Sequence, residues 1–203
     1  MIEVALEHIP VLLDEAIELL AIKPGGTYVD CTVGLGGHTE RILDEMRGKG
    51  LLVALDRDSE SLQSVSEDFR YRSNLVSFHH ENFKNLPLVL PNLGIENIDG
   101  CLVDLGVSRY QLTHPDRGFT FTEEGPLDMR MDRDQQTTAE DLVNHLNEPE
   151  LADIFRRYGE EPQARKIARA IVEQRQRRRI KTTTELADLV RTVKTSRRSS
   201  RIH

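Results

Sequence analysis

Apolar residues recur at two alternating spacings over residues 11–104. Spacings near 3.6 residues predict helices, and short apolar runs between turn residues predict buried strands. Alternating strands and helices joined by short turns predict an α/β fold, in which a parallel sheet with strand order 3-2-1-4 is covered on both faces. The expected helices cover residues 11–22, 38–46 and 59–69, with a short irregular helix over 83–90, and the expected strands cover 27–31, 51–55, 74–79 and 98–104.

The pattern changes after Leu105. Residues 106–134 are rich in Gly, Pro, Asp and Arg and show no clear period. The stretch 117–132 is too long for a simple connector, and its apolar side chains favour packing over disorder. We therefore predict a first domain over residues 1–107 and a second over 108–203, which combines this loop with an inserted all-α module. The helices of that module are expected over 138–146, 149–158, 163–177 and 184–193.

A glycine-rich turn follows the first expected strand, where residues 29–39 have the sequence VDCTVGLGGHT. Glycines allow a sharp turn and let a ligand approach the backbone. Asp56 ends the second expected strand, 20 residues after Gly36. In doubly wound folds an acid at this place accepts hydrogen bonds from ribose hydroxyls. The spacing therefore predicts an adenosine-containing cofactor, and a tight turn without a ligand remains the alternative.

The identity of that cofactor depends on position 39. The dinucleotide fingerprint needs a third glycine or alanine there, and this chain has Thr39. Methyltransferases of class I, which use S-adenosylmethionine, carry an acid at the end of each of the first two strands and a looser glycine loop, as Asp30 and Asp56 do here. No pyrophosphate has to be held in that case. The pattern favours S-adenosyl-L-methionine over NAD, and no hydride-transfer partner is recognisable.

Composition narrows the class of protein. A length of 203 residues suits one or two domains, and no stretch approaches the roughly 20 apolar residues of a membrane span. The first ten residues carry acids where a secretory signal would carry bases. We expect a cytoplasmic protein without membrane contact. Cys31 and Cys101 lie in apolar runs without metal or redox spacing, so we expect two buried thiols and no metal site.

Charge is distributed unevenly along the chain. Residues 156–203 contain 15 Lys and Arg against 5 Asp and Glu, whereas the whole chain has a net charge of −7. Basic clusters at 173–181 and 194–201 could neutralise several phosphates and give salt-dependent nucleic-acid binding. Charged helix faces are often only solvated, so this reading stays open at the level of charge alone.

Six motifs in order make the chain similar to a known family. They are HIPVLLDEAI from His8, VDCTVGLGGHT from Val29, ALDRD from Ala54, DGCLVDLGVS from Asp99, RGFTFTEEGPLDMRMD from Arg117, and YGEE followed by ARKIARAIV from Tyr158. The chain resembles the bacterial small-subunit ribosomal RNA cytosine methyltransferases of the RsmH (MraW) type. The resemblance implies a Rossmann-like class I methyltransferase that transfers a methyl group to the exocyclic amine of a cytosine in 16S ribosomal RNA.

The resemblance also implies roles for single residues. It gives cofactor contacts to Gly36, Gly37, His38, Asp56, Phe83, Asp104 and Gln111. Phe83 would flank the adenine, and a core position is its alternative; for His38 the alternative is a locally bonded residue at a helix start. The family continues past position 203 with further strands, so the resemblance implies a C-terminally truncated chain with an incomplete sheet of four strands.

The implied mechanism relies on positioning. Methyl transfer from a sulfonium is an in-line displacement, so the enzyme must hold the amine on the line of the S–CH3 bond. Asp104 is the expected catalytic residue, because a carboxylate that accepts one amine proton helps the nitrogen lone pair to attack. Further groups near the base are expected among Asp128, Arg130 and Asp132.

The expected partner is small-subunit ribosomal RNA in the 30S subunit, and a homodimer is left open. The base would leave its helix to reach the pocket, and the helical module would grip the RNA. Two rival functions remain: a methyltransferase of a small molecule or protein, and a protein that binds cofactor or RNA without turnover. The residues expected to grip RNA are Arg165, Lys166, Arg169, Arg175, Arg177, Arg178 and Arg179.

Overall fold

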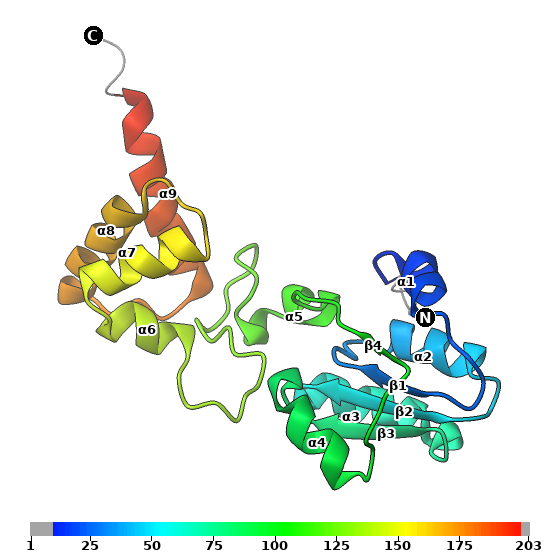
Figure 1. Ribbon diagram of the computed structural model, residues 1–203. Coiled ribbons are helices and arrows are strands. Elements are labelled where there is room, and N and C mark those ends of the chain that lie inside the picture. Colours follow the sequence, from blue (N-terminus) through cyan, green and yellow to red (C-terminus); the bar gives the residue numbers. More distant parts are fainter. Residues whose placement is uncertain (1–9, 200–203) are drawn as a thin grey trace, which may run out of the picture. The chain divides into compact units, whose positions relative to one another are not determined.

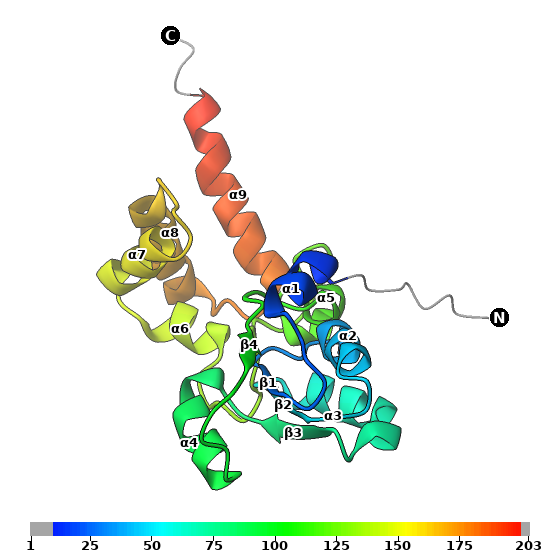
Figure 2. The same cartoon turned by 45° about the vertical axis from the view of Figure 1, so that its right-hand side comes forward.

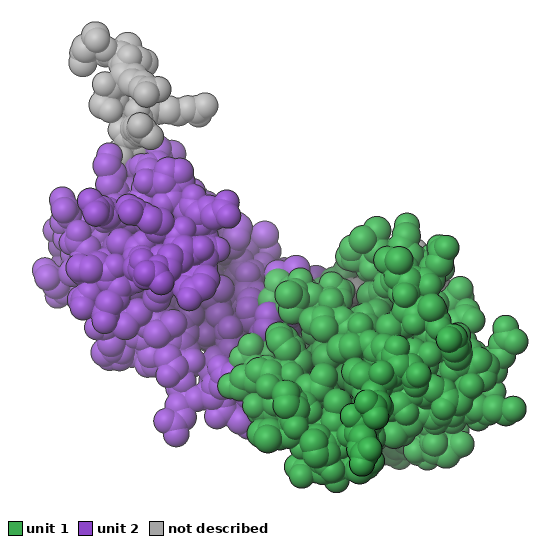
Figure 3. Space-filling view, in the orientation of Figure 1, with its two compact units in different colours: residues 1–110 green, residues 111–203 purple. Residues whose placement is uncertain are grey.

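The computed structural model describes residues 10–199 of the chain, with side chains up to Thr195. His8 of the first motif and Arg201 of the last basic cluster lie outside the described residues. The chain divides into two compact units, residues 1–110 and 111–203 (Figure 3). No helix among the described residues combines the length and the apolar character needed to cross a membrane.

Unit 1 is built on a parallel sheet of four strands (Figure 1). The strand order is β3-β2-β1-β4, as the sequence predicts. β1 is the inner strand that pairs with both β2 and β4, with Val29 opposite Val53 on one side and Cys101 on the other. All four carboxyl ends therefore lie at one edge of the sheet. The strands are β1 (Thr27–Asp30), β2 (Leu51–Asp56), β3 (Val76–His80) and β4 (Gly100–Leu102).

Successive residues of β1 and β2 point to opposite faces of the sheet, and each face has its own core. Tyr28 and Leu52 pack on one face with apolar residues of the first three helices. Val29 and Val53 pack on the other face with Leu86, Val89 and other residues around the fourth helix. Figures 1 and 2 show α2 and α4 on opposite sides of the sheet. The central strands are buried on both sides, which explains their continuous apolar runs.

The helices of unit 1 begin and end near the expected positions. Asp58 caps α3 by accepting from the backbone N–H groups of Glu60 and Ser61. Pro87 fits the first turn of α4, and Pro91 lies near its end, so the helix is short but contains both prolines. The elements are α1 (Leu13–Leu20), α2 (Gly37–Glu45), α3 (Ser59–Asp68), η1 (Arg70–Arg72), η2 (Phe83–Asn85) and α4 (Leu86–Asn92).

β4 differs from its prediction in length and in burial. It spans three residues, and Asp104 lies two residues beyond its end. The expectation that Cys101 is buried is wrong: Cys31 is buried and Cys101 is exposed. The reason is that β4 is the edge strand of the sheet, so its side chains are covered less than those of β1. The two sulfurs lie 3.5 Å apart, and burial raises the pKa of the Cys31 thiol to about 12, so Cys31 stays a neutral thiol.

Unit 2 is a loop followed by a helical module. Leu127 from the loop packs with Leu151, Ile167 and Ile171 in the core of the module. Thr138 and Asn147 form capping boxes with Asp141 and Glu150, which fixes where α6 and α7 begin. The elements are α5 (Arg109–Thr113, which starts in unit 1), η3 (Pro115–Arg117), α6 (Ala139–His145), α7 (Glu148–Arg157), α8 (Ala164–Arg177) and α9 (Thr183–Ser199).

The loop before α6 is packed at a few points only. Arg117 is 1% exposed, and its guanidinium donates to the carbonyl oxygens of Arg130 and Met131 at 3.1 and 3.0 Å. Leu127 is buried, whereas Phe121 and Met129 are exposed. The charged side chain of Arg117, rather than the aromatic residues, therefore holds the two ends of this loop together.

Shortening Leu151 to Ala should destabilise the helical module strongly. The side chain is 2% exposed in the core of unit 2, and such a cavity costs about 2–5 kcal/mol. Leu142→Ala in α6 is the matched control, since Leu142 is 38% exposed, and it should cost less than half as much. Chemical unfolding followed by circular dichroism measures both. Equal losses in the two variants would contradict this packing.

Candidate functional site

Three aspartates follow the carboxyl ends of adjacent strands in unit 1. Asp30 ends β1 and Asp56 ends β2, and Asp104 lies two residues after β4. Ligands of open α/β sheets bind at this edge. Backbone hydrogen bonds continue past the strands here, because Val33 donates to the carbonyl of Leu55 at 3.1 Å. The three acids thus line one side of a connected set of loops.

The carboxylate of Asp30 is fully buried and fully used. It accepts from the Thr39 hydroxyl at 2.7 Å and from the Thr32 backbone N–H at 3.1 Å. Burial raises the pKa of Asp30 above its ordinary value, and these two hydrogen bonds and the nearby His38 oppose the rise. Asp30 therefore joins the end of β1 to the first turn of α2, and its role is to hold the loop.

Asp56 is half-buried and holds the same loop from the other side. One oxygen accepts from the backbone N–H of Gly34 at 2.7 Å, and the other accepts from the backbone N–H of Asp58 at 2.9 Å. Burial raises the pKa of Asp56, and these hydrogen bonds oppose the rise. A carboxylate has about four acceptor sites, so Asp56 can still accept from a diol.

The three glycines of the loop serve different purposes. A Cβ on Gly34 would meet no atom within 4 Å, so this position faces open space. A Cβ on Gly36 would lie 2.9 Å from a methyl carbon of Val65, and one on Gly37 would lie 2.3 Å from the Cγ of Pro10. Packing therefore explains Gly36 and Gly37, and Gly34 is the glycine that leaves room for a ligand.

His38 lies in the first turn of α2 and is 6% exposed. Its charge would act on Asp30, since a positive His38 lowers the pKa of that carboxyl. This position agrees with both readings of the sequence, a cofactor-loop residue and a residue buried at a helix start.

Asp104 is exposed, and its backbone is fixed. Its N–H donates to the Thr32 hydroxyl at 2.8 Å, which ties the segment after β4 to the loop after β1. The carboxylate of Asp104 is thus presented to solvent from an anchored backbone. Sequence reasoning missed Thr32 and treated Thr39 only as a departure from the dinucleotide pattern. Threonine hydroxyls close to strand-ending acids were the available signal for both.

Phe83 begins η2 just after β3 and is 40% exposed. The turn that carries it is held by Asn82, which accepts from the Lys84 N–H at 3.0 Å, and by Glu81, which accepts from the Asn82 N–H at 2.8 Å. Partial exposure leaves part of the ring available to a flat ligand. Its place outside the three core clusters disagrees with a core aromatic.

Gln111 belongs to unit 2, lies in α5 and is buried. The structure therefore gathers Gly36, Gly37, His38, Asp56 and Asp104 around the carboxyl ends of β1, β2 and β4, with Phe83 on the turn after β3, and describes Gln111 with the second unit.

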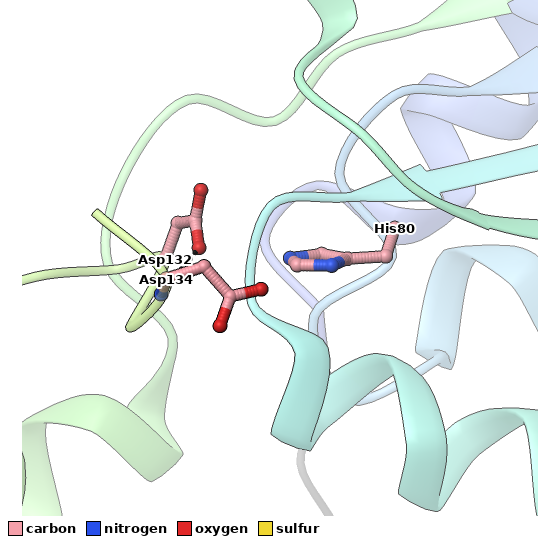
Figure 4. Close-up of side chains that lie close together, drawn as sticks. All are labelled: His80, Asp132 and Asp134. Carbon is pink, nitrogen blue, oxygen red and sulfur yellow. Dashed lines mark hydrogen bonds between the residues drawn. The ribbon is translucent and has the colours of Figure 1, made fainter.

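Residues of the loop in unit 2 are engaged with each other. The guanidinium of Arg130 donates to both oxygens of Asp128, each at 2.8 Å, and hydrogen bonds from Arg130 lower the pKa of Asp128. Figure 4 shows Asp132 and Asp134 on one turn of this loop, where Asp132 accepts from the Asp134 N–H at 2.9 Å. His80, drawn with them, ends β3 in unit 1, and each group is described here with its own unit.

The basic residues of the helical module fall into two groups. Arg175 donates to the carbonyl of Val143 at 2.7 Å, and Arg169, Arg178 and Arg179 pair with Glu148, Glu185 and Glu140. Arg165, Lys166 and Arg177 are exposed and form no salt bridge with a described residue. Four of the seven expected RNA contacts thus have structural partners as well.

Replacing Asp30 with Asn should flatten the dependence of stability on pH. As the pH rises above 3.8, the ordinary value, the unfolded chain loses the Asp30 proton first, because the folded pKa is higher. Folded stability therefore falls until the pH passes the folded pKa. An asparagine keeps an acceptor for Thr32 and can donate to Thr39. Chemical unfolding from acid to neutral pH should show a shallower decline in Asp30→Asn, with exposed Asp68→Asn as the control; an unchanged slope would contradict the buried charge.

Comparison with known proteins adds to this geometry. The model of the MraW methylase family matches residues 5–203. A protein named ribosomal RNA small subunit methyltransferase H from Halothermothrix orenii is 46% identical over 92% of this chain and 60% of its own length. The protein of the same name from Solibacter usitatus is 51% identical over 90% of this chain and 63% of its own length. The chain thus spans less than two thirds of these relatives.

A solved structure titled as a methyltransferase homolog from Pyrococcus horikoshii is 24% identical over 49% of this chain and 30% of that chain, with a TM-score of 0.36. A likeness this low adds nothing to the fold, which rests on the strand order itself. The match to nearly the whole chain, together with acids at the ends of β1 and β2 around an open glycine, shows that this chain belongs to the MraW methylase family.

Proposed function

We propose that the protein methylates ribosomal RNA of the small subunit with S-adenosyl-L-methionine as methyl donor, and that its target is the exocyclic N4 amine of a cytosine in 16S RNA. The observation that carries the proposal is the Asp56 carboxylate, bonded to the Gly34 N–H beside open space, in a chain of the MraW methylase family. The names of the two relatives support ribosomal RNA as the substrate.

The residues present suit this cofactor. Asp56 keeps acceptor capacity for two ribose hydroxyls, and Phe83 offers a partly exposed ring for the adenine. The carboxylate of Asp104 would attract the ammonium and sulfonium charges. The bound cofactor would supply an electrophilic methyl group. We propose that Gly36, Gly37, His38, Asp56, Phe83, Asp104 and Gln111 hold it.

Asp104 is the proposed catalytic residue. Its backbone is anchored by Thr32 while its side chain is exposed, so it can meet a base that enters from solvent. A cytosine amine is a poor nucleophile, because its lone pair is delocalised into the ring. A carboxylate that accepts a hydrogen bond from one amine proton favours a pyramidal nitrogen with a localised lone pair. Holding the amine in line for attack supplies most of the remaining acceleration.

The helical module is the proposed RNA-binding part. Exposed cations on α8 would neutralise phosphates, while contacts to the flipped base would specify the target. The 30S subunit in the cytoplasm is the proposed setting, and the number of copies that act together is left open.

Titration calorimetry tests the cofactor first. The chain should bind S-adenosylmethionine saturably and should not bind NAD. Asp56→Ala should weaken binding by about 10- to 100-fold, because hydrogen bonds to a charged group contribute about 1.5–3 kcal/mol and the Gly34 loop loses its anchor. Asp68→Ala, an exposed acid at the end of α3, is the control and should bind normally. Equal affinity of the Asp56 and Asp68 variants would contradict the assignment.

Methyl transfer to small-subunit RNA tests Asp104. Asp104→Ala should lower kcat by about 100-fold or more, the usual range for a positioned proton acceptor, and should change cofactor affinity far less. The exposed Glu96→Ala controls for the loss of a nearby negative charge. Transfer is followed with isotopically labelled methyl groups, and the modified nucleoside is identified by mass spectrometry. Full activity of Asp104→Ala would remove it from the mechanism, and a modified base other than cytosine would overturn the proposed target.

A further inference from the structure

A groove of about 440 Å³ runs between α7 and α8 in unit 2. The two helices lie side by side in both views (Figures 1 and 2). Residues 148, 149, 152, 153 and 156 share one face of α7, and 165 and 169 share one face of α8, because these spacings return to the same side of a helix. The lining side chains are Glu148, Pro149, Ala152, Asp153, Arg156, Arg165 and Arg169.

The two acids of the groove already have cationic partners. Glu148 pairs with Arg169 at 3.5 Å within the groove. Asp153 accepts from the Nε of Arg157 at 2.9 Å, and Arg157 is outside the lining. Arg156 and Arg165 are exposed and form no salt bridge with any residue that the structure describes. The groove therefore presents two uncompensated guanidinium groups, one from each wall.

The shape of the groove suits a nucleotide unit better than a simple ion. Its volume falls in the range of roughly 300–1,000 Å³ that holds small organic ligands. Ala152, which is 8% exposed, and Pro149 form a small apolar part of the wall, against which a sugar or base can pack. Two guanidinium groups on facing walls can both donate to phosphate oxygens, and such charge-assisted bonds are strong and directional.

We propose that this groove binds one phosphodiester of single-stranded RNA between Arg156 and Arg165, next to the segment that carries the target base. The proposal rests on the proposed RNA substrate and names where the helical module holds it. Other exposed cations of the module, such as Lys166 and Arg177, lie outside the groove lining and contribute only to diffuse attraction. The structure thus separates a built phosphate site from a generally basic surface.

The test compares two double variants of equal charge. Arg156→Ala/Arg165→Ala removes both groove cations, and Lys166→Ala/Arg177→Ala removes two exposed cations of α8 outside it. None of the four side chains is part of a core cluster, so both variants should keep the melting temperature. Binding of a short labelled single-stranded RNA is measured by fluorescence anisotropy at several salt concentrations.

The groove variant should bind at least tenfold more weakly at low salt. Its slope of log K against log salt should fall by about 1.4, since each lost contact to a single strand removes about 0.7. The control variant should change the slope by less than half of that. Arg156→Lys/Arg165→Lys should restore most of the slope, because the charges return.

Two outcomes would overturn the proposal. Equal losses in the groove and control variants would show diffuse binding over α8, with the RNA part of the proposed function intact. Absence of salt-dependent RNA binding by the wild-type chain would remove both the groove site and the RNA substrate, and titration with S-adenosylmethionine would then show whether the cofactor site stands without them.

Discussion

The buried carboxylate of Asp30 is the interaction on which the candidate site depends. A charge in this position is costly unless it is hydrogen-bonded, and Thr39 and Thr32 satisfy it from the two segments that must be brought together. Thr32 in turn anchors the backbone of Asp104 through its hydroxyl. One buried acid at the end of the central strand therefore positions the helix start and, through Thr32, the segment after β4.

Much of unit 1 could be predicted, because its central strands are buried on both faces and leave continuous apolar runs in the sequence. The strand order and the acids at the strand ends followed from that pattern. The roles of the glycines could not be predicted in the same way. Gly36 and Gly37 look like ligand-facing residues in sequence, but their neighbours are Val65 and Pro10, and such tertiary contacts leave no periodic signal. The exposure of Cys101 depended on which strand is at the edge.

The helical module shows how little total charge says about function. Its excess of arginine suggests a uniform basic surface, but several of these side chains serve the fold. Arg175 closes onto the carbonyl of Val143, and Arg179 joins α8 to Glu140 of α6. The cations that remain exposed and uncompensated are few, and their positions on helices, rather than their number in the sequence, decide what they can bind.

The contact between Gly37 and Pro10 limits how this family of sequences can vary. A side chain at position 37 would enter the space of the proline ring, and only a change at position 10 could make room for it. The two sites, 27 residues apart in the chain, should therefore change together or not at all among homologous proteins. A substitution at either one alone would be selected against even though neither residue needs to touch a substrate.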